Sequence, residues 1–433
     1  MANNSDHIGI YPEESLHYPG WRVVFICQLG VLSGIATIFF TLFTLFIGPW
    51  QHDFGWNREQ ISQAFSLAAI TVAICSPIMG RLLDRFEPRK LIAGMMVAFG
   101  LGFASLAWLT PQLGRFEVTA VFIGIAGTGT YQLGYARIVA GWFERRLGMA
   151  LSVVVAGSGV GSLFIPPLVQ HAITVYGWRP TILILSLLPL LVGAPLTFFF
   201  APSPSAHPVP KSVISSPSED KGTPWKRALA TRSFWLIVLG VGCMSLAENG
   251  VLVHLVPMLS DRGLKAEDAA FIVSILGGSA VAGRLLLGWI LDYLEGAGVA
   301  MGALLLAASG IFLLGHAQSF HAAALASLVA GLGMGCEYDL IPYMLKRYFG
   351  MKSFSTLYGL SYSVYAVAGG TAPLLLGYVY DATGSYTRIL SLFSAITAVM
   401  ALTMLTLPAY RYLASSDAIE VNSIDQKTAI ESR

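Results

Sequence analysis

The chain has 433 residues, of which 55% are hydrophobic and only 12% carry a charge. A soluble domain has about 25% charged residues, so this composition excludes an ordinary soluble protein. The formal net charge of +2 is small, and we expect no nucleic-acid partner.

Uncharged apolar runs recur along the whole chain and predict twelve membrane-spanning helices. A helix that crosses the hydrocarbon core needs about 20 mostly apolar residues. The predicted spans are centred near residues 35, 70, 100, 128, 160, 190, 245, 280, 306, 332, 367 and 400. Tryptophan prefers membrane interfaces, and eight of the nine Trp residues fall near predicted span ends.

The spans form two groups of six, separated by a polar stretch rich in Pro and Ser. We expect an N-terminal segment over 1–20, a first six-helix bundle over 21–200, a linker over 201–232, a second six-helix bundle over 233–412 and a tail over 413–433. Lys and Arg are more frequent in the loops after even-numbered spans, which places both termini in the cytoplasm of a cell (inner) membrane protein. The first residues lack the apolar core of a signal peptide, so the first span is expected to stay in the mature protein.

The second half of the chain repeats the first at a fixed offset. Glu59, Gly80, Asp84 and Glu87 recur as Glu267, Gly288, Asp292 and Glu295, each 208 residues later (267−59, 288−80, 292−84, 295−87). An internal duplication in a membrane protein is typical of two bundles with a binding site between them. Each half is therefore a control for the other, and a charge found in only one copy points to function.

One segment resembles the signature loop of the major facilitator superfamily. It is Gly80-Arg-Leu-Leu-Asp84-Arg-Phe-Glu-Pro-Arg89-Lys90, with Pro88 where the pattern normally has Gly. Other segments resemble the branch of monocarboxylate transporters and oxalate–formate antiporters: Tyr18-Pro-Gly-Trp21, Phe54-Gly-Trp56, Trp142-Phe-Glu-Arg-Arg-Leu-Gly148 and Gly283-Arg284. The resemblance implies an all-α integral membrane protein, with twelve transmembrane helices in two pseudo-symmetric six-helix bundles, that works by alternating access.

In that branch an Arg in the eighth helix is associated with anionic substrates, and Arg284 occupies that place. Vertebrate members pair this Arg with an Asp one turn earlier, where the present chain has Ala280. They also carry a Lys in the first helix, where the chain has Phe40, and the bacterial oxalate exchanger has a Lys in the eleventh, where residues 354–380 contain none. The charge set of the branch is therefore incomplete here.

Ionisable groups at membrane depth are costly, so each is a functional candidate. The predicted spans contain six: Arg137, Glu248, His254, Arg284, Glu337 and Asp339. Arg284 corresponds to Ser76 in the first half, and its guanidinium can hold a carboxylate bidentately. The alternative is an internal salt bridge between Arg284 and Glu337.

Two carboxyl groups are candidates for carrying a coupling proton. Glu248 lies near the middle of the seventh span and corresponds to Phe40, and burial favours its protonated form. Glu337 is the second candidate. The alternative for Glu248 is a hydrogen-bonded side chain beside Asn249 that only packs helices, and His254 is expected to be a wetted interface residue.

Further polar residues are expected to gate or to line the pathway. Arg137 is expected to pair with Asp84 as a cytoplasmic latch, as often happens in the family, and Asp292 and Asp339 are assigned to the same class. Asp339 would then lie near Lys346 or Arg347. The expected substrate site collects the polar tips of Tyr131, Gln132, Tyr135, Asn249, Tyr362 and Tyr365 around Arg284.

These residues predict a secondary transporter of a small organic anion, with proton coupling or exchange. The sequence has no metal cluster, nucleophile constellation or phosphate loop, so we expect neither an enzyme nor a bound cofactor or metal. Two alternatives stay open: a proton-driven carrier or exporter of a neutral or weakly basic solute, because the six groups include three acids against two Arg, and a non-transporting membrane sensor. The expected partners are an organic acid and the lipid bilayer, and the protein is expected to be a monomer.

Overall fold

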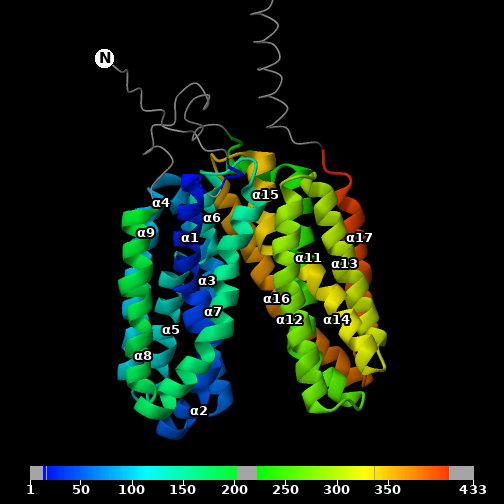
Figure 1. Cartoon of the computed structure of the whole chain (residues 1–433). Coiled ribbons are helices and arrows are strands. Elements are labelled where there is room, and N and C mark those ends of the chain that lie inside the picture. Colours follow the sequence, from blue (N-terminus) through cyan, green and yellow to red (C-terminus); the bar gives the residue numbers. More distant parts are fainter. Residues whose placement is uncertain (1–12, 16, 202–221, 336, 409–433) are drawn as a thin grey trace, which may run out of the picture. The chain divides into compact units, whose positions relative to one another are not determined.

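The computed structural model describes residues 13–15, 17–201, 222–335 and 337–408 (Figure 1). Within these ranges the secondary structure is helical, apart from one isolated β-bridge between Gly222 and Gly350. Most of the expected linker, the whole expected tail and much of the expected N-terminal segment lie outside the described residues.

Six helical segments correspond to the first six predicted spans. They are α1 (Pro19–Leu32) with the π-helix η1 (Ala36–Thr41) and α2 (Phe43–Phe54); α3 (Arg58–Arg85); α4 (Pro88–Ser105) with η2 (Leu106–Trp108); α5 (Leu113–Thr128) with α6 (Gln132–Ala140); α7 (Leu147–Tyr176); and α8 (Trp178–Leu187) with η3 (Leu188–Gly193) and α9 (Ala194–Phe200).

Six more follow the short helix α10 (Trp225–Leu229). They are α11 (Arg232–Asp261), α12 (Ala266–Leu291), α13 (Gly296–His316), α14 (Phe320–Met334) with α15 (Glu337–Phe349), α16 (Phe354–Thr383) and α17 (Thr387–Met404). The twelve predicted spans are therefore all present as helices.

Ten of these segments are long and apolar enough to cross a membrane by themselves. The two others are α5–α6 and α16, the fourth and eleventh segments. The first is interrupted between Thr128 and Gln132, and α16 contains many Ser, Thr and Tyr residues. The two segments on which the sequence places most of the polar substrate-site residues are thus the two least suited to face lipid on all sides.

Contacts divide the chain into two compact units. The first contains residues 1–65 and 86–218, and the second contains residues 66–85 and 219–433. The helix α3 therefore contributes its first residues to one unit and its remaining residues to the other. The bundle boundaries expected from the sequence stay a prediction.

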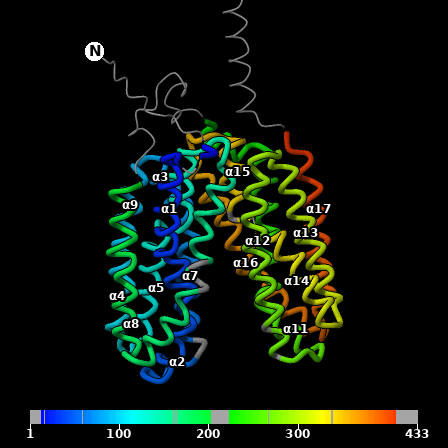
Figure 2. Tube along the Cα trace, viewed as in Figure 1, coloured from blue at the N-terminus to red at the C-terminus, as the bar shows by residue number. Residues whose placement is uncertain are grey.

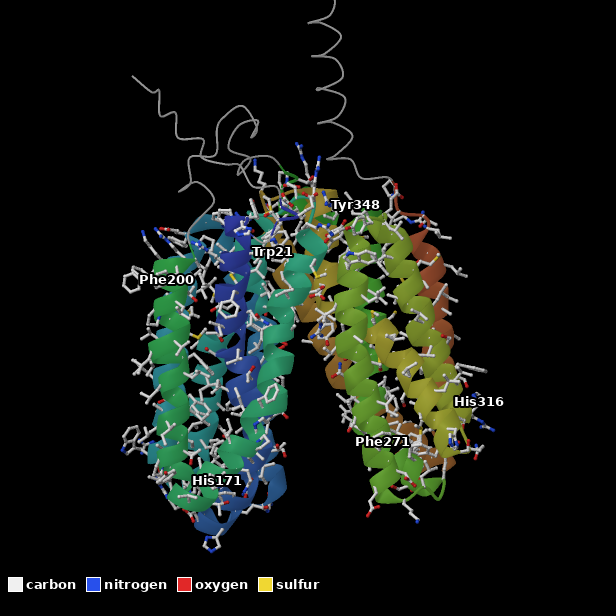
Figure 3. All side chains as sticks on the ribbon, in the orientation of Figure 1. Trp21, His171, Phe200, Phe271, His316 and Tyr348 are labelled. Atoms are coloured by element: carbon white, nitrogen blue, oxygen red, sulfur yellow. The ribbon has the colours of Figure 1, made fainter. Side chains whose placement is uncertain are left out.

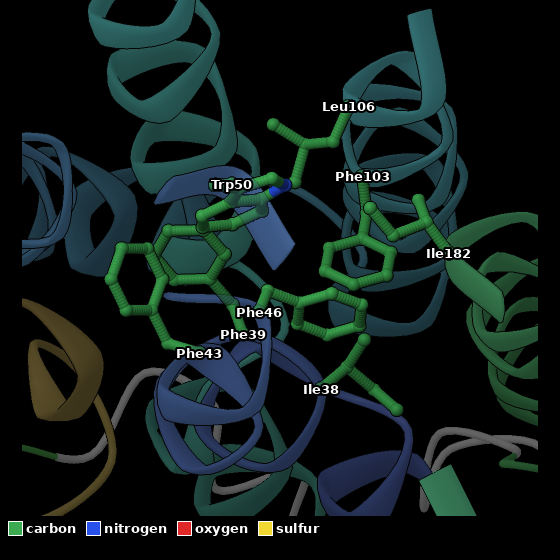
Figure 4. Close-up of a pocket in the computed structure, with 8 residues that line it drawn as sticks. All are labelled: Ile38, Phe39, Phe43, Phe46, Trp50, Phe103, Leu106 and Ile182. Carbon is green, nitrogen blue, oxygen red and sulfur yellow. The ribbon is translucent and has the colours of Figure 1, made fainter. Parts of the chain in front are cut away.

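Aromatic side chains fill the core of the first unit (Figure 4). Phe43 and Trp50 of α2 meet edge to face with their ring centroids 5.4 Å apart, and Phe116 of α5 meets Trp50 at 5.0 Å. Trp50 is only 1% exposed. Rings of this size bury large apolar areas, so the cluster fixes α2 against its neighbours.

Small residues form the core of the second unit instead, where α13 packs against α14 and α17 (Figure 2). Ala303, Ala307 and Ala330 are fully buried. A Cβ atom on Gly310 would strike the backbone of Ala330, so only glycine allows α13 and α14 to approach this closely.

Candidate functional site

Three membrane segments are interrupted along their length. The first stops at Leu32 and resumes after a turn at Ser33 and Gly34, the fourth is broken between α5 and α6, and the tenth between α14 and α15. A break exposes backbone N–H and C=O groups that the hydrocarbon core cannot satisfy, so broken helices are tolerated where they line a protected cavity or a binding site.

In the first unit, two of these breaks pack against each other. The Thr130 hydroxyl accepts a hydrogen bond from the Ile35 backbone N–H at 3.1 Å. Gly34 lies so close to the Thr130 carbonyl that a Cβ atom there would collide with it. The turn in the first segment is therefore stabilised by the turn in the fourth segment.

Polar atoms next to these breaks are left unsatisfied. Gln132, the first residue of α6, is 4% exposed, and its Oε1 is buried with no hydrogen-bond partner among the residues that the structure describes. The Thr37 hydroxyl, in the π-helix η1, is also buried and makes no hydrogen bond within the described part of the chain. Such atoms are costly and call for an explanation, and a polar ligand is one. Gln132 was predicted from the sequence, but Thr37 was not, because a threonine in an apolar run carries no charge to signal it.

The two tyrosines that the sequence assigned to this segment differ in their surroundings. Tyr131 lies in the break itself and is half-buried. Tyr135 is fully buried, and its hydroxyl lies 3.2 Å from the Thr197 hydroxyl of α9. The Tyr135 hydroxyl is thus engaged within the unit in this conformation.

In the second unit, Arg284 of α12 lies against the break between α14 and α15. Its Nε donates a hydrogen bond to the Gly335 carbonyl at 3.0 Å and lies 3.8 Å from Asp339 Oδ2. The Arg284 side chain is 13% exposed and the Asp339 side chain is not exposed at all. Any side chain on Gly335 would strike the Ala280 carbonyl, so glycine is what brings α12 and the break together.

The charged partner of Arg284 differs from the one expected. From the sequence, Glu337 was offered as the internal partner of Arg284. The expected closeness of Asp339 to Lys346 or Arg347 stays a prediction. The structure gives the ion pair with Arg284 to Asp339. Glu337 instead accepts a hydrogen bond from the Tyr365 hydroxyl at 2.7 Å on its Oε1.

Glu337 is fully buried beside a second carboxyl group. Glu248 of α11 and Arg284 of α12 are the charged side chains that interact with Glu337. Among the described residues, no N–H or O–H group donates to the buried oxygens Glu248 Oε2 and Glu337 Oε2, and the two carboxyl groups interact with each other. Tyr362 stacks on Tyr365 with the ring centroids 5.7 Å apart, which places both of the tyrosines expected on α16 at this cluster. We call Glu248, Arg284, Glu337, Asp339 and Tyr365 the charged cluster.

Two polar residues of α11 are engaged with neighbouring protein groups. The Asn249 amide donates to the Ser245 carbonyl at 3.0 Å. His254 was expected to be wetted, but Nδ1 lies 3.2 Å from the Tyr386 hydroxyl and Nε2 lies 3.0 Å from the Pro373 carbonyl. The imidazole is half-buried and joins α11 to α16.

Asp84 of the signature segment caps a helix. Its carboxylate accepts hydrogen bonds from the backbone N–H groups of Ser355 at 3.0 Å and Thr356 at 2.8 Å, and from the Thr356 hydroxyl at 2.7 Å. These are the first residues of α16, and a negative charge is favourable at a helix N-terminus. Arg137 lies in the last turn of α6, and Asp292 directly follows α12. The pairing of Asp84 with Arg137 stays a prediction.

The family follows from comparison with known proteins. A model described as Major Facilitator Superfamily matches residues 29–373, which is most of the chain. The protein belongs to this superfamily. It is therefore a multi-pass membrane transporter and not an enzyme, as the sequence predicted. Among the described residues, no group of three or more His, Cys, Asp or Glu side chains is arranged to hold a metal ion.

Relatives by sequence are similar at a low level. Monocarboxylate transporter 12 of Rattus norvegicus is 25% identical over 398 residues, which covers 85% of this chain and 81% of the relative. The uncharacterised MFS-type transporter YcxA of Bacillus subtilis (strain 168) is 25% identical over 370 residues, covering 83% and 89%.

Solved structures share the fold. The E. coli fucose:proton symporter FucP is similar with a TM-score of 0.69 at 17% identity, over 89% of this chain and 99% of that one. The human organic anion transporter MFSD10 is similar with a TM-score of 0.65 at 15% identity, also over 89% and 99%. At these identities the likeness shows the fold alone.

Proposed function

We propose that this transporter moves a small organic anion by alternating access, coupled to a proton or by exchange. The observation that carries the proposal is the charged cluster, in which Arg284 and two buried carboxyl groups meet at the broken tenth segment. The relatives named monocarboxylate transporters support the substrate class.

Arg284 is proposed to bind the substrate carboxylate. The Gly335 carbonyl and Asp339 both engage Nε, which orients the planar guanidinium. A guanidinium binds a carboxylate through two parallel hydrogen bonds. A substrate anion competes with Asp339 for this charge, so the ion pair and the substrate complex alternate during the cycle.

Glu248 and Glu337 are proposed to carry the proton. The two carboxyl groups interact with each other inside membrane-spanning segments, and ionisable groups at that depth are candidates for carrying a proton. The Tyr365 hydroxyl orients Glu337. Opening the site to water on either side allows the proton to leave.

The remaining expected residues have supporting roles in the proposal. Tyr131, Gln132, Tyr362 and Asn249 provide polar contacts for the substrate, and Tyr135 supports the helix that carries Gln132. Asp84 and Arg137 form a cytoplasmic latch, with Asp292 as the second copy of Asp84. We place the protein in the cell (inner) membrane as a monomer, with both termini in the cytoplasm.

A second function is favoured by the balance of charge in the charged cluster. The carboxyl groups of Glu248, Glu337 and Asp339 lie in this cluster with Arg284, and Asp339 pairs with that arginine. A proton-driven carrier or exporter of a neutral or weakly basic solute would use the same carboxyl groups.

Uptake into proteoliposomes distinguishes the two functions. Radiolabelled small carboxylic acids are compared with neutral and weakly basic molecules of matched size, with and without a pH gradient. We expect a pH gradient to drive accumulation of at least one carboxylate. Accumulation of a neutral or basic solute, with none of the carboxylates transported, would establish the second function instead.

A further inference from the structure

The first unit has an open groove between the start of α1 and the end of α9. Its volume is about 520 Å³, and it is lined by Trp21, Arg22, Phe25, Ile26, Leu196 and Phe200. Trp21 and Phe200 lie toward the same end of the unit (Figure 3). Phe25 is 58% exposed and Phe200 is 59% exposed, so the wall of the groove is an accessible apolar surface.

The groove follows the direction of the helices. Arg22 and Ile26 are one turn apart on α1, and Leu196 and Phe200 are one turn apart on α9, so each pair lies on one helix face. Both helices belong to segments that are long and apolar enough to cross a membrane. The apolar wall therefore runs inward from the membrane surface, as an acyl chain does.

Arg22 provides the polar end of the groove. Its side chain is exposed and makes no ion pair or hydrogen bond with any residue that the structure describes. Trp21 next to it is held in place, because its indole N–H donates to the Glu13 carbonyl at 3.1 Å. Glu14, an acid of the same segment, is directed to Arg145 at 3.9 Å. Arg22 is thus an exposed cation near the start of a membrane helix, and no acidic side chain of the described residues forms an ion pair with it.

We propose that this groove binds an anionic phospholipid. The phosphodiester lies at Arg22, whose planar guanidinium donates hydrogen bonds to two phosphate oxygens, and one acyl chain lies along Phe25, Ile26, Leu196 and Phe200. With the orientation proposed above, the lipid belongs to the cytoplasmic leaflet. The site does not depend on the identity of the transported substrate.

Quenching of tryptophan fluorescence by brominated lipid tests the site on the whole protein. The protein is reconstituted in vesicles of equal parts phosphatidylglycerol and phosphatidylcholine, with bromine on the acyl chains of only one of them. Each variant is compared with the same variant carrying Trp21→Phe, so that the difference reports quenching at Trp21. The variants are Arg22→Gln, Arg22→Lys and, as a matched exposed arginine at the start of α5, Arg115→Gln.

In the unmutated protein we expect brominated phosphatidylglycerol to occupy the site about fivefold more strongly than brominated phosphatidylcholine, the preference that one basic residue near an anionic surface gives. Arg22→Gln removes the preference, while Arg22→Lys and Arg115→Gln keep it. Equal quenching by the two lipids in the unmutated protein, or an unchanged preference in Arg22→Gln, overturns the proposal. Loss of the preference on adding inorganic phosphate would assign the site to free phosphate and overturns the lipid assignment.

Discussion

The Tyr365 hydroxyl donates a hydrogen bond to Glu337 Oε1 across 2.7 Å. This bond joins α16 to the helix that resumes after the break in the tenth segment. It also holds one of the two carboxyl groups to which we assign the proton. Its removal should therefore affect both stability and transport.

Tyr365→Phe keeps the ring that stacks on Tyr362 but removes the hydroxyl. A buried oxygen of Glu337 then loses its donor, which costs about 1–3 kcal/mol. We expect a lower midpoint of thermal unfolding in detergent and a loss of pH-gradient-driven accumulation. Tyr378→Phe is the control, because Tyr378 is on the same helix and is 76% exposed. Equal behaviour of the two variants would show that the hydroxyl has no role.

The Arg284–Asp339 ion pair allows binding to be separated from folding. Arg284→Gln leaves the buried Asp339 without its charged partner, and breaking such a pair costs about 3–5 kcal/mol. We expect the double variant Arg284→Gln with Asp339→Asn to recover much of the thermal stability but none of the substrate binding. Arg284→Lys keeps the charge and loses the planar fork, so substrate affinity should fall at least about tenfold. Recovery of binding in the double variant would exclude Arg284 as the substrate ligand.

The Asp84 cap on α16 is tested by a double-mutant cycle. Asp84→Ala removes the acceptor of three hydrogen bonds, and loss of a helix cap costs about 0.5–2 kcal/mol. Thr356→Val removes one of the same hydrogen bonds from a residue that is 2% exposed. We expect the two losses in unfolding free energy to be non-additive by about 0.5 kcal/mol or more. Strictly additive losses would mean that the two side chains act independently.

The loop end of the first unit should lose stability in acid. Asp53 of α2 accepts hydrogen bonds from Trp178 Nε1 at 2.9 Å and Arg179 Nη1 at 3.0 Å, both on α8. The Trp178 N–H, followed by His52 and Arg179, holds the pKa of the Asp53 carboxyl below its ordinary value. The pKa of Asp53 is lower in the folded protein than its ordinary value. The charged Asp53 therefore stabilises the fold at a pH above the ordinary pKa, and this stabilisation is lost as the pH falls through the folded-state pKa.

The measurement compares the thermal stability of the unmutated protein and Asp53→Asn at about pH 5 and about pH 3, on either side of the ordinary Asp pKa of about 3.9. At about pH 5 we expect the unmutated protein to be more stable than Asp53→Asn. At about pH 3 this difference in stability between the two proteins should be smaller. If the stability difference between the two proteins is the same at both pH values, the charge of Asp53 is not the cause of that difference.

The sequence predicted the helices better than the charged contacts. Apolar runs are local, so the twelve spans could be read directly from them, and the superfamily was recognised from the signature segment. The break before Glu337 could not be placed, although Gly331, Gly333 and Gly335 cluster there.

Contacts distant in sequence had no local signal. The ion pair of Arg284 with Asp339 depends on the close approach that Gly335 allows, and the cap of Asp84 on α16 joins residues 271 positions apart. The meeting of Glu248 and Glu337 likewise depends on the packing of α11 against α15. The sequence identified these residues as costly charges but not as partners.

The most direct test of the account compares accumulation and exchange in the same proteoliposomes for Glu248→Gln and Glu337→Gln. Glutamine resembles the protonated carboxyl group but cannot release a proton. We predict that each variant loses accumulation driven by a pH gradient and still exchanges external labelled substrate for internal unlabelled substrate. If both variants accumulate substrate as strongly as the unmutated protein, the carboxyl pair does not carry the proton and the proposed coupling is contradicted.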